Sequence, residues 1–347
     1  MEKDLFQAKK YFYELPKEQI AQNPVEPRDM AKLLVLERET GKLHHRIFRE
    51  VGDFLRSGDL LVLNDTKVLA ARLFGEKAES GGKVEIFLLR PSERGPHVWE
   101  ALVRPGKKLK RHTRVFLDKG IAVHVLPSSL EGGLRFVEFP ESLDVYAFLE
   151  DCGIVPLPPY ITESRAEADQ YQTIYARELG SVAAPTAGLH FTEQLLKDLQ
   201  KKGISLAFLT LHIGLGTFRP VQVEDIRDHT MHEEHFEISS STVRAVEETK
   251  KRKGKVIAVG TTAVRGLETG ASSGVLRAGK DVSTLFIYPG YSFRVVDGII
   301  TNFHLPQSTL LMLVSAFGGY EKVSYAYREA VEKGYRFYSF GDAMMIL

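Results

Sequence analysis

The stretch KVEIFLL at residues 83–89 alternates apolar and polar side chains and follows the pair Gly81-Gly82. Four comparable runs follow it, at residues 97–103, 113–117, 121–126 and 134–139. Turn residues separate them, at 105–106, 119–120 and 132–133. Short alternating runs at this spacing, with little helical periodicity, are typical of a small antiparallel barrel or sandwich. We therefore expect an all-β unit inside a longer chain.

On both sides of this unit the apolar residues run almost without interruption, at 59–63, 204–213, 255–259 and 284–288. Such runs suit strands that are covered on both faces, as in α/β domains. We expect helices at 192–202, 240–252, 308–317 and 323–333, with Thr192 as a cap and Gly203 as a stop. The predicted fold is a mixed α/β main domain, a barrel-like sheet with surrounding helices, over residues 1–66 and 156–347. A small antiparallel β barrel at residues 67–155 interrupts it, and a Pro-rich linker at 156–159 marks the return.

The composition is that of an ordinary globular protein, with 347 residues, 44% hydrophobic and 26% charged. No run of about 18 apolar residues appears, and the first residues lack the apolar core of a signal peptide, so we expect a cytoplasmic protein without a membrane partner. Cys152 is the only cysteine, which excludes an intramolecular disulfide. The net charge of +1 exerts no global pull on a polyanion, so nucleic-acid binding would rest on basic clusters such as 107–114 or 250–255. Taken singly, each cluster reads better as a solvated loop or helix end.

The turns after the apolar runs are the places to search for chemistry, because ligands bind beyond the carboxyl ends of strands in an open α/β sheet. One turn holds Gly260, Thr261 and Thr262 before Arg265, where a helix amino end can bind an anion or hydroxyls. A second holds His212, Gly214 and Gly216. A third region runs from Asp297 to Asn302 and His304. Each is weak evidence alone, since caps and plain turns use the same residues.

The segment AAPTAGLHF at residues 183–191 mixes Pro185, Gly188 and His190, and it precedes a predicted helix. Alone it fits a turn and a catalytic loop equally well. Three histidines, His229, His232 and His235, offer a rival interpretation as metal ligands. Their spacing is not the i, i+4 pair of the helical zinc motif, so an exposed acidic, histidine-rich loop is the simpler interpretation.

Taken together, the segments closely resemble the family of S-adenosylmethionine:tRNA ribosyltransferase-isomerases of queuosine biosynthesis. The matching stretches run through the chain in family order: YELP (13–16) with IAQ (20–22), GDLLV (58–62) with ARLFG (71–75), PLPPYI (156–161), YQTIYA (171–176), VAAPTAGLHF (182–191), HIGLGTFRPV (212–221), MHEE (231–234), VGTTAVR (259–265), TNFHLP (301–306) and YRFYSFGDAM (335–344). Small departures occur at Ala31-Lys32, Ala70 and 169–170, and the central motifs are intact.

The resemblance implies transfer and isomerisation of the ribosyl part of S-adenosylmethionine onto a 7-aminomethyl-7-deazaguanine at the tRNA wobble position. The product would be epoxyqueuosine-tRNA, with release of adenine and methionine. S-adenosylmethionine is then a cosubstrate and no prosthetic group or metal is needed. The partner is tRNA, presented through its anticodon loop, and we expect a monomer.

The resemblance also suggests roles for particular side chains. The expected catalytic residues are His190, as the first candidate for the base, with His212, His232, Glu234, His304 and Asp342. The expected residues for S-adenosylmethionine or the deazaguanine are Thr186, Gly188, Phe191, Tyr171, Gly214, Gly216, Thr261, Thr262, Arg265, Asp297, Asn302 and Phe303. The expected tRNA contacts are Lys107, Lys108, Lys110, Arg111 and Arg114. Two other classes remain open: an RNA-binding module with a degenerate active site, and a metal hydrolase centred on the three spaced histidines.

Overall fold

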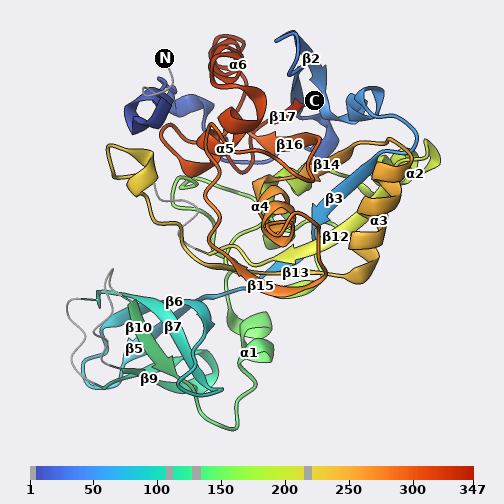
Figure 1. Ribbon diagram of the computed structural model, residues 1–347. Helices are drawn as coiled ribbons and strands as arrows, with labels where there is room; N and C mark the ends of the chain where they lie inside the picture. Colours follow the sequence, from blue (N-terminus) through green and yellow to red (C-terminus); the bar gives the residue numbers. More distant parts are fainter. Residues whose placement is uncertain (1–4, 107–111, 127–133, 215–220) are drawn as a thin grey trace. The chain divides into compact units, whose positions relative to one another are not determined.

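The computed structural model describes residues 5–106, 112–126, 134–214 and 221–347 (Figure 1). The chain forms two compact units. The larger comprises Met1–Lys67, Pro158–Glu178 and Ala184–Leu347, and the smaller comprises Val68–Leu157 with Leu179–Ala183. Each unit is described by itself.

The smaller unit contains a closed antiparallel barrel whose strands follow the order β10-β7-β6-β5-β8-β9. The strands are β5 (Arg72–Lys77), β6 (Lys83–Pro91), β7 (Val98–Arg104), β8 (Thr113–Leu117), β9 (Ala122–Leu126) and β10 (Leu134–Glu138). Pairing of β10 with β9, as at Val137 and Val125, closes the sheet. Alternate side chains point inward around Trp99, which is 1% exposed. The barrel predicted from the alternating runs is therefore confirmed, and α1 (Val145–Cys152), capped by Asp144, is an addition that the runs did not predict.

The larger unit is built on a nine-stranded sheet of order β15-β13-β12-β3-β14-β16-β17-β1-β2. Its strands are β1 (Lys32–Leu36), β2 (Leu43–Ile47), β3 (Leu60–Asn64), β12 (Ser205–Leu211), β13 (Glu234–Ile238), β14 (Val256–Val259), β15 (Gly279–Ser283), β16 (Gly298–Asn302) and β17 (Ala343–Ile346). The four central strands β12, β3, β14 and β16 are parallel. This mixed α/β unit confirms the predicted fold class. The end strands β15 and β2 do not pair with each other among the described residues, so the sheet differs in that respect from the barrel-like form we expected.

The two faces of this sheet are covered by different elements, because successive strand residues point to opposite sides. Leu61 and Ile257 on one face pack with Phe191, and the cluster also includes Leu195 and Leu199 of α2 (Glu193–Lys201). On the other face, Gly266 of α4 (Thr261–Gly270) lies against Leu209. Gly318 of α5 (Thr309–Gly318) lies against Leu36 and Ile346 on that same face. Figure 1 shows α4 beside the central strands and α6 (Tyr320–Glu332) beside β17.

The predicted helices of the larger unit are confirmed within a few residues at their ends. Thr192 accepts a hydrogen bond from the Leu195 amide (3.2 Å) as the cap of α2, and Ser308 caps α5 in the same way. The helix expected at 240–252 is α3 (Ser240–Lys251), capped by Ser239. The remaining short elements are β4 (Thr66–Val68), β11 (Glu178–Ser181) and the 3₁₀ turns η2 (Ala8–Tyr11), η3 (Lys17–Gln19), η4 (Arg28–Met30), η5 (Phe48–Phe54), η7 (Asp118–Gly120), η9 (Ala168–Tyr171), η10 (Thr186–His190) and η12 (Ile226–Asp228).

The strand expected at residues 284–288 was wrong. The strand of that region is β15, which ends at Ser283, and residues 284–288 are irregular. Ile287 is buried, but the segment pairs with no described strand, and Phe286 packs against Tyr288 (5.1 Å between ring centroids) and His229 (5.4 Å). A local aromatic cluster thus produces the same apolar run as a buried strand.

Candidate functional site

A pocket with a cavity volume of about 70 Å³ lies where the central parallel strands of the larger unit end. Ile213 follows β12, Gly260 follows β14, and Asn302 is the last residue of β16. The remaining walls come from η10, from the start of α5 and from Tyr160, Tyr338 and Ser339. The position at the carboxyl edge of the strands agrees with the place that the sequence analysis singled out.

The amino end of α4 forms one side of this pocket. Gly260 precedes the helix with a φ of 89°, a left-handed conformation that favours glycine, and as a glycine it supplies no capping side chain. The first amides of an α-helix have no intrahelical acceptors, so they can bind negative charge. The Thr262 hydroxyl accepts a hydrogen bond from Asn64 Nδ2 (3.0 Å). Asn64 ends β3, and it fixes the direction of this hydroxyl.

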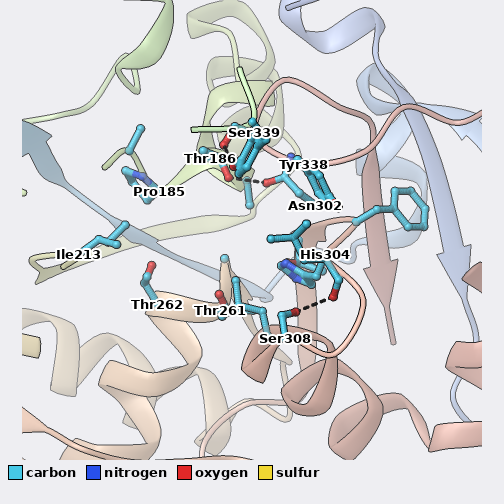
Figure 2. Close-up of a pocket in the computed structure, with 18 residues that line it drawn as sticks. Pro185, Thr186, Ile213, Thr261, Thr262, Asn302, His304, Ser308, Tyr338 and Ser339 are labelled. Carbon is cyan, nitrogen blue, oxygen red and sulfur yellow. Dashed lines mark hydrogen bonds between the residues drawn. The ribbon is translucent and has the colours of Figure 1, made fainter. Parts of the chain in front are cut away.

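Asn302 links the pocket to the residues behind it. Its Oδ1 accepts a hydrogen bond from the Thr186 hydroxyl (2.8 Å), so its Nδ2 donates to His190 Nε2 (3.3 Å). Figure 2 shows Thr186 and Asn302 pointing toward each other across one end of the pocket. His190 does not line the pocket, and its ring lies 4.9 Å from that of Phe48. The first candidate for the base therefore lies one layer behind the cavity.

The imidazole of His190 is held neutral. Burial, followed by the nearby charges of Arg28 and Arg336, lowers its pKa to about 3. A neutral ring whose Nε2 accepts from Asn302 carries its proton on the other nitrogen. The ring therefore acts as an oriented acceptor that fixes the amide of Asn302.

His304 is the histidine that does line the pocket, and Figure 2 shows it opposite Ser308. Its Nε2 lies 2.8 Å from the Thr301 hydroxyl. Its main chain is fixed by two tyrosines, since its amide donates to the Tyr327 oxygen (3.0 Å) and its carbonyl accepts from the Tyr13 hydroxyl. Burial lowers the pKa of His304 to about 3. A neutral imidazole at a cavity wall can accept a proton from a bound ligand.

Glu234 and Arg265 are paired with each other and do not line the pocket. Their side chains are 3% and 5% exposed, and the guanidinium also donates to the Ser283 carbonyl (3.3 Å). The other carboxylate oxygen of Glu234 accepts from the Gly214 amide (3.3 Å). The pair therefore ties α4 to β13 and to the turn after β12.

His212 lies in a second groove with His235 and Lys280, and its Nδ1 is 2.8 Å from the Thr66 hydroxyl. Burial lowers the pKa of His212, and His235 adds to that effect. His232 is exposed. The histidines expected to cooperate thus occupy separate places.

Two of the expected carboxylates also lie away from the pocket. Asp297 sits at the amino end of β14 and β16, where it accepts from the Val256 amide (2.8 Å) and pairs with Lys250 (2.6 Å). Asp342 accepts from the amides of Lys32 (2.9 Å) and Arg336 (2.8 Å). Both carboxylates tie strand ends together.

The aromatic and glycine candidates have different surroundings. Phe303 lines the pocket, whereas Phe191 lies in the sheet core, edge-on to Phe48 at 4.9 Å. Tyr171 is fully buried and edge-on to Phe340 at 5.8 Å. Gly188 permits a close approach, because a Cβ there would come within 2.0 Å of the Tyr175 hydroxyl. Of these four, only Phe303 borders the pocket.

Several expected residues fall outside the part of the chain that the structure describes: Gly216, Lys107, Lys108, Lys110 and Arg111. Arg114 is described, is exposed on β8, and lies over the Phe116 ring (5.0 Å to the centroid). Among the described residues, no group of three or more His, Cys, Asp or Glu side chains is arranged to hold a metal ion. The same residues contain no helix long and apolar enough to cross a membrane.

Several residues that line the pocket were not individual candidates from the sequence: Tyr160, Tyr338, Ser339, Thr301 and Ser308. Each lies in or beside a segment that carried the family resemblance. These residues line the pocket because the chain turns at Tyr338 and because distant segments come together there. Hydrophobic periodicity in the sequence reveals neither.

Comparison with known proteins places the chain in a family. The model of the family described as "Queuosine biosynthesis protein" matches residues 8–346. A relative from Heliobacterium modesticaldum, named S-adenosylmethionine:tRNA ribosyltransferase-isomerase, is 55% identical over 97% of this chain and 98% of its own length. A relative of the same name from Halothermothrix orenii is 52% identical over 96% and 98% of the two chains.

A solved structure of S-adenosylmethionine tRNA ribosyltransferase from Thermotoga maritima is also similar. It is 40% identical, has a TM-score of 0.56, and covers 97% of this chain and 100% of its own. Matches of this extent go well beyond a shared fold, and they agree with the ordered motifs of the sequence. The chain belongs to the S-adenosylmethionine:tRNA ribosyltransferase-isomerase family of queuosine biosynthesis.

Proposed function

We propose that this protein transfers the ribosyl part of S-adenosylmethionine to 7-aminomethyl-7-deazaguanine at the tRNA wobble position and isomerises it. The products are epoxyqueuosine-tRNA, adenine and methionine. Family membership supports the reaction class. The observation that supports the location is the pocket at the carboxyl edge of the sheet, which brings together Thr186, Thr261, Asn302 and His304 from distant parts of the chain.

The chemistry requires a base, because the sulfonium acidifies an adjacent ribose C–H. We assign this role to His304, since it is the candidate histidine whose side chain lines the pocket. The sugar ring then opens and expels adenine, which takes up a proton, and the neutral amine of the deazaguanine adds to the electrophilic carbon. Methionine leaves when an oxygen on the neighbouring carbon displaces its sulfur and closes the epoxide. General acid–base steps of this kind contribute roughly 10²–10⁴-fold to the rate.

His190 has a different role in this proposal from the one first expected. It accepts from Asn302 and does not line the pocket, so it orients Asn302. The side-chain amide oxygen of Asn302 and the Thr186 hydroxyl then face the ribose hydroxyls. Glu234, Asp342 and His212 support the surrounding strand ends.

The methionine carboxylate is assigned to the amino end of α4. Gly260, Thr261 and Thr262 line the pocket there, and Gly260 at the N-cap position supplies no capping side chain. Arg265, the earlier candidate, already pairs with the buried Glu234. A helix amino end recognises carboxylates through its free amides and its dipole.

The tRNA must present one splayed base to the pocket, while cations hold its backbone. We propose the basic run at 107–114, including Arg114, for this purpose. Replacing its lysines and arginines by Ser should weaken tRNA binding and flatten its salt dependence, because fewer counterions are then released. Unchanged affinity and salt slope would remove the run from the proposal. We further propose a cytoplasmic monomer that uses S-adenosylmethionine as its cosubstrate and needs no prosthetic group.

The test is incubation of the purified protein with S-adenosylmethionine and tRNA carrying the aminomethyl-deazaguanine base. Adenine release and the mass of the tRNA are followed together. The proposal predicts stoichiometric adenine and a tRNA heavier by the ribosyl-derived group. A methylated tRNA, or tRNA of unchanged mass without adenine, would contradict it. A parallel reaction with a chelator should proceed at the same rate, whereas a metal hydrolase would stop.

A further inference from the structure

Two residues beside the pocket have a left-handed backbone although neither is glycine. Tyr338 has a φ of 72° and Gln307 a φ of 57°. Tyr338 lines the pocket, and Gln307 lies between the lining residues Leu305 and Ser308. Such a conformation is rare for a bulky side chain, and rare backbone conformations gather at functional sites. The turn at Tyr338 is therefore a candidate functional feature of the pocket.

The turn is held in place by main-chain hydrogen bonds. The Tyr338 amide donates to the Phe303 carbonyl (3.1 Å), and the Gly341 amide donates to the Tyr338 carbonyl (3.0 Å). Gly341 allows the tight return, since a Cβ there would lie 2.5 Å from the Arg336 carbonyl oxygen. As a result, the consecutive residues Tyr338 and Ser339 both line the pocket. In an extended strand, consecutive side chains would point to opposite sides.

The turn sets Tyr338 beside a second tyrosine of the pocket. The ring centroids of Tyr338 and Tyr160 are 4.8 Å apart, with an angle of 53° between the rings. The Tyr160 hydroxyl lies 2.7 Å from Ser339 Oγ, which fixes its ring. Figure 2 shows Tyr338 and Ser339 at one side of the pocket and Thr261, Thr262 and Ser308 at the other. The aromatic rings thus stand on one side of the pocket, together with the Ser339 hydroxyl, and face the hydroxyls of Thr261, Thr262 and Ser308.

We propose that Tyr338 and Tyr160 form an aromatic wall on which a planar purine-type base of the substrate stacks. The inference rests on the proposed function, in which two such bases occur: the adenine of S-adenosylmethionine and the deazaguanine of the tRNA. Stacking needs a flat apolar face, while the hydroxyls across the pocket suit polar atoms at the edge of the base. The left-handed turn keeps the ring of Tyr338 in the pocket before the substrate arrives.

The test uses Tyr338→Leu, Tyr338→Phe and Tyr160→Leu. Equilibrium dialysis measures the affinity for S-adenosylmethionine and for free adenine without tRNA, and initial rates give the KM for tRNA. Tyr320→Leu is the matched control, because Tyr320 also packs edge-on to a tyrosine, Tyr11 at 5.6 Å, but lines a different groove. Thermal unfolding identifies variants that are not folded at the assay temperature.

Loss of base stacking should weaken binding by at least roughly fivefold in both Leu variants. The Phe variant and Tyr320→Leu should stay within about twofold of the wild type, a change too small for a lost stacking contact. A loss in adenine and S-adenosylmethionine affinity assigns the wall to adenine, and a rise only in the KM for tRNA assigns it to the deazaguanine. The proposed stacking wall is contradicted if the folded Leu variants keep the wild-type affinities and the wild-type KM for tRNA. It is also contradicted if Tyr338→Phe loses as much affinity as Tyr338→Leu, or if the wild type binds none of these probes. If the wild type binds S-adenosylmethionine but releases no adenine, the proposed reaction is wrong. The binding data of the variants then still decide whether the two tyrosines form a stacking wall.

Discussion

Two layers of polar residues at the carboxyl edge of the main sheet differ in what they contact. The front layer, Thr186, Thr261, Asn302 and His304, lines the pocket. The rear layer contains His190 and the Glu234–Arg265 pair, which are buried and bond to protein groups. Both layers come from the same sequence motifs. A motif of this kind therefore specifies the support of a site as well as its surface.

The largest expected effect is the loss of stability when one partner of the buried ion pair in the rear layer is removed. Arg265→Met leaves the Glu234 carboxylate buried without its cation, and loss of one partner of a buried pair costs roughly 3–5 kcal/mol. Urea unfolding of the larger unit measures the change. Lys250→Met is the control, because its pair with Asp297 is partly exposed and should cost less than about 1 kcal/mol. Equal costs for the two variants would contradict the layered account.

The next largest effect is a loss of kcat when either of the two buried histidines, one in each layer, is replaced. His304→Gln should lower kcat by about 10²-fold or more, since it removes the proposed base. His190→Gln should lower kcat by only about tenfold, because it acts through the direction of Asn302. Single-turnover adenine release at a temperature where both variants are folded measures the difference. The exposed His124 of the barrel, changed to Gln, is the control. A larger loss at His190 would reverse the assignment.

An effect that is smaller per pH unit concerns the dependence of the free energy of unfolding on pH. Burial lowers the pKa values of His190 and His304 to about 3, while an unfolded histidine titrates near 6.5. Below about pH 6.5 the unfolded chain binds protons that the folded chain does not, so stability falls as the pH drops toward 3. Each of the two histidines lowers the free energy of unfolding by up to about 1.4 kcal/mol for every pH unit that the pH falls in that window.

The measurement is the free energy of unfolding at several pH values. His190→Asn should flatten its slope below pH 6.5 relative to the wild type, and His124→Gln should leave the slope unchanged. An unaltered slope in the His190 variant would show that the ring does not remain neutral when folded.

The smallest effect is expected at the opposite edge of the sheet. Asp297→Asn keeps an acceptor for the Val256 amide and loses only the pairing with Lys250. Stability should fall by less than about 1 kcal/mol, and kcat should not change. Steady-state kinetics and thermal unfolding measure both. A large loss of kcat would mean that the reaction takes place near Asp297.

Much of the fold was predictable because its signals are local. Alternation over residues 83–89 predicted a barrel strand, and Thr192 and Ser308 marked helix starts through their capping side chains. The wrong strand at 284–288 shows the limit, since aromatic packing between Phe286 and Tyr288 produces the same apolar run. Strand order was not readable, because it depends on pairings between distant segments.

The site was predictable only as a set of motifs. Sequence identified Thr186, Asn302 and His304, which do line the pocket. It could not separate them from His190, because Thr186 and His190 stand four residues apart on one short turn and the sequence does not show which of them faces the cavity. It also passed over Tyr338 and Ser339, whose joint entry depends on one left-handed turn.

The most direct test of the layered account is a crystal structure of the protein with bound S-adenosylmethionine. The account predicts the methionine carboxylate at the amides of Thr261 and Thr262, and the ribose within hydrogen-bonding distance of Asn302 and Thr186. Density at Asp297, or in the groove beside His212 and His235, would contradict it.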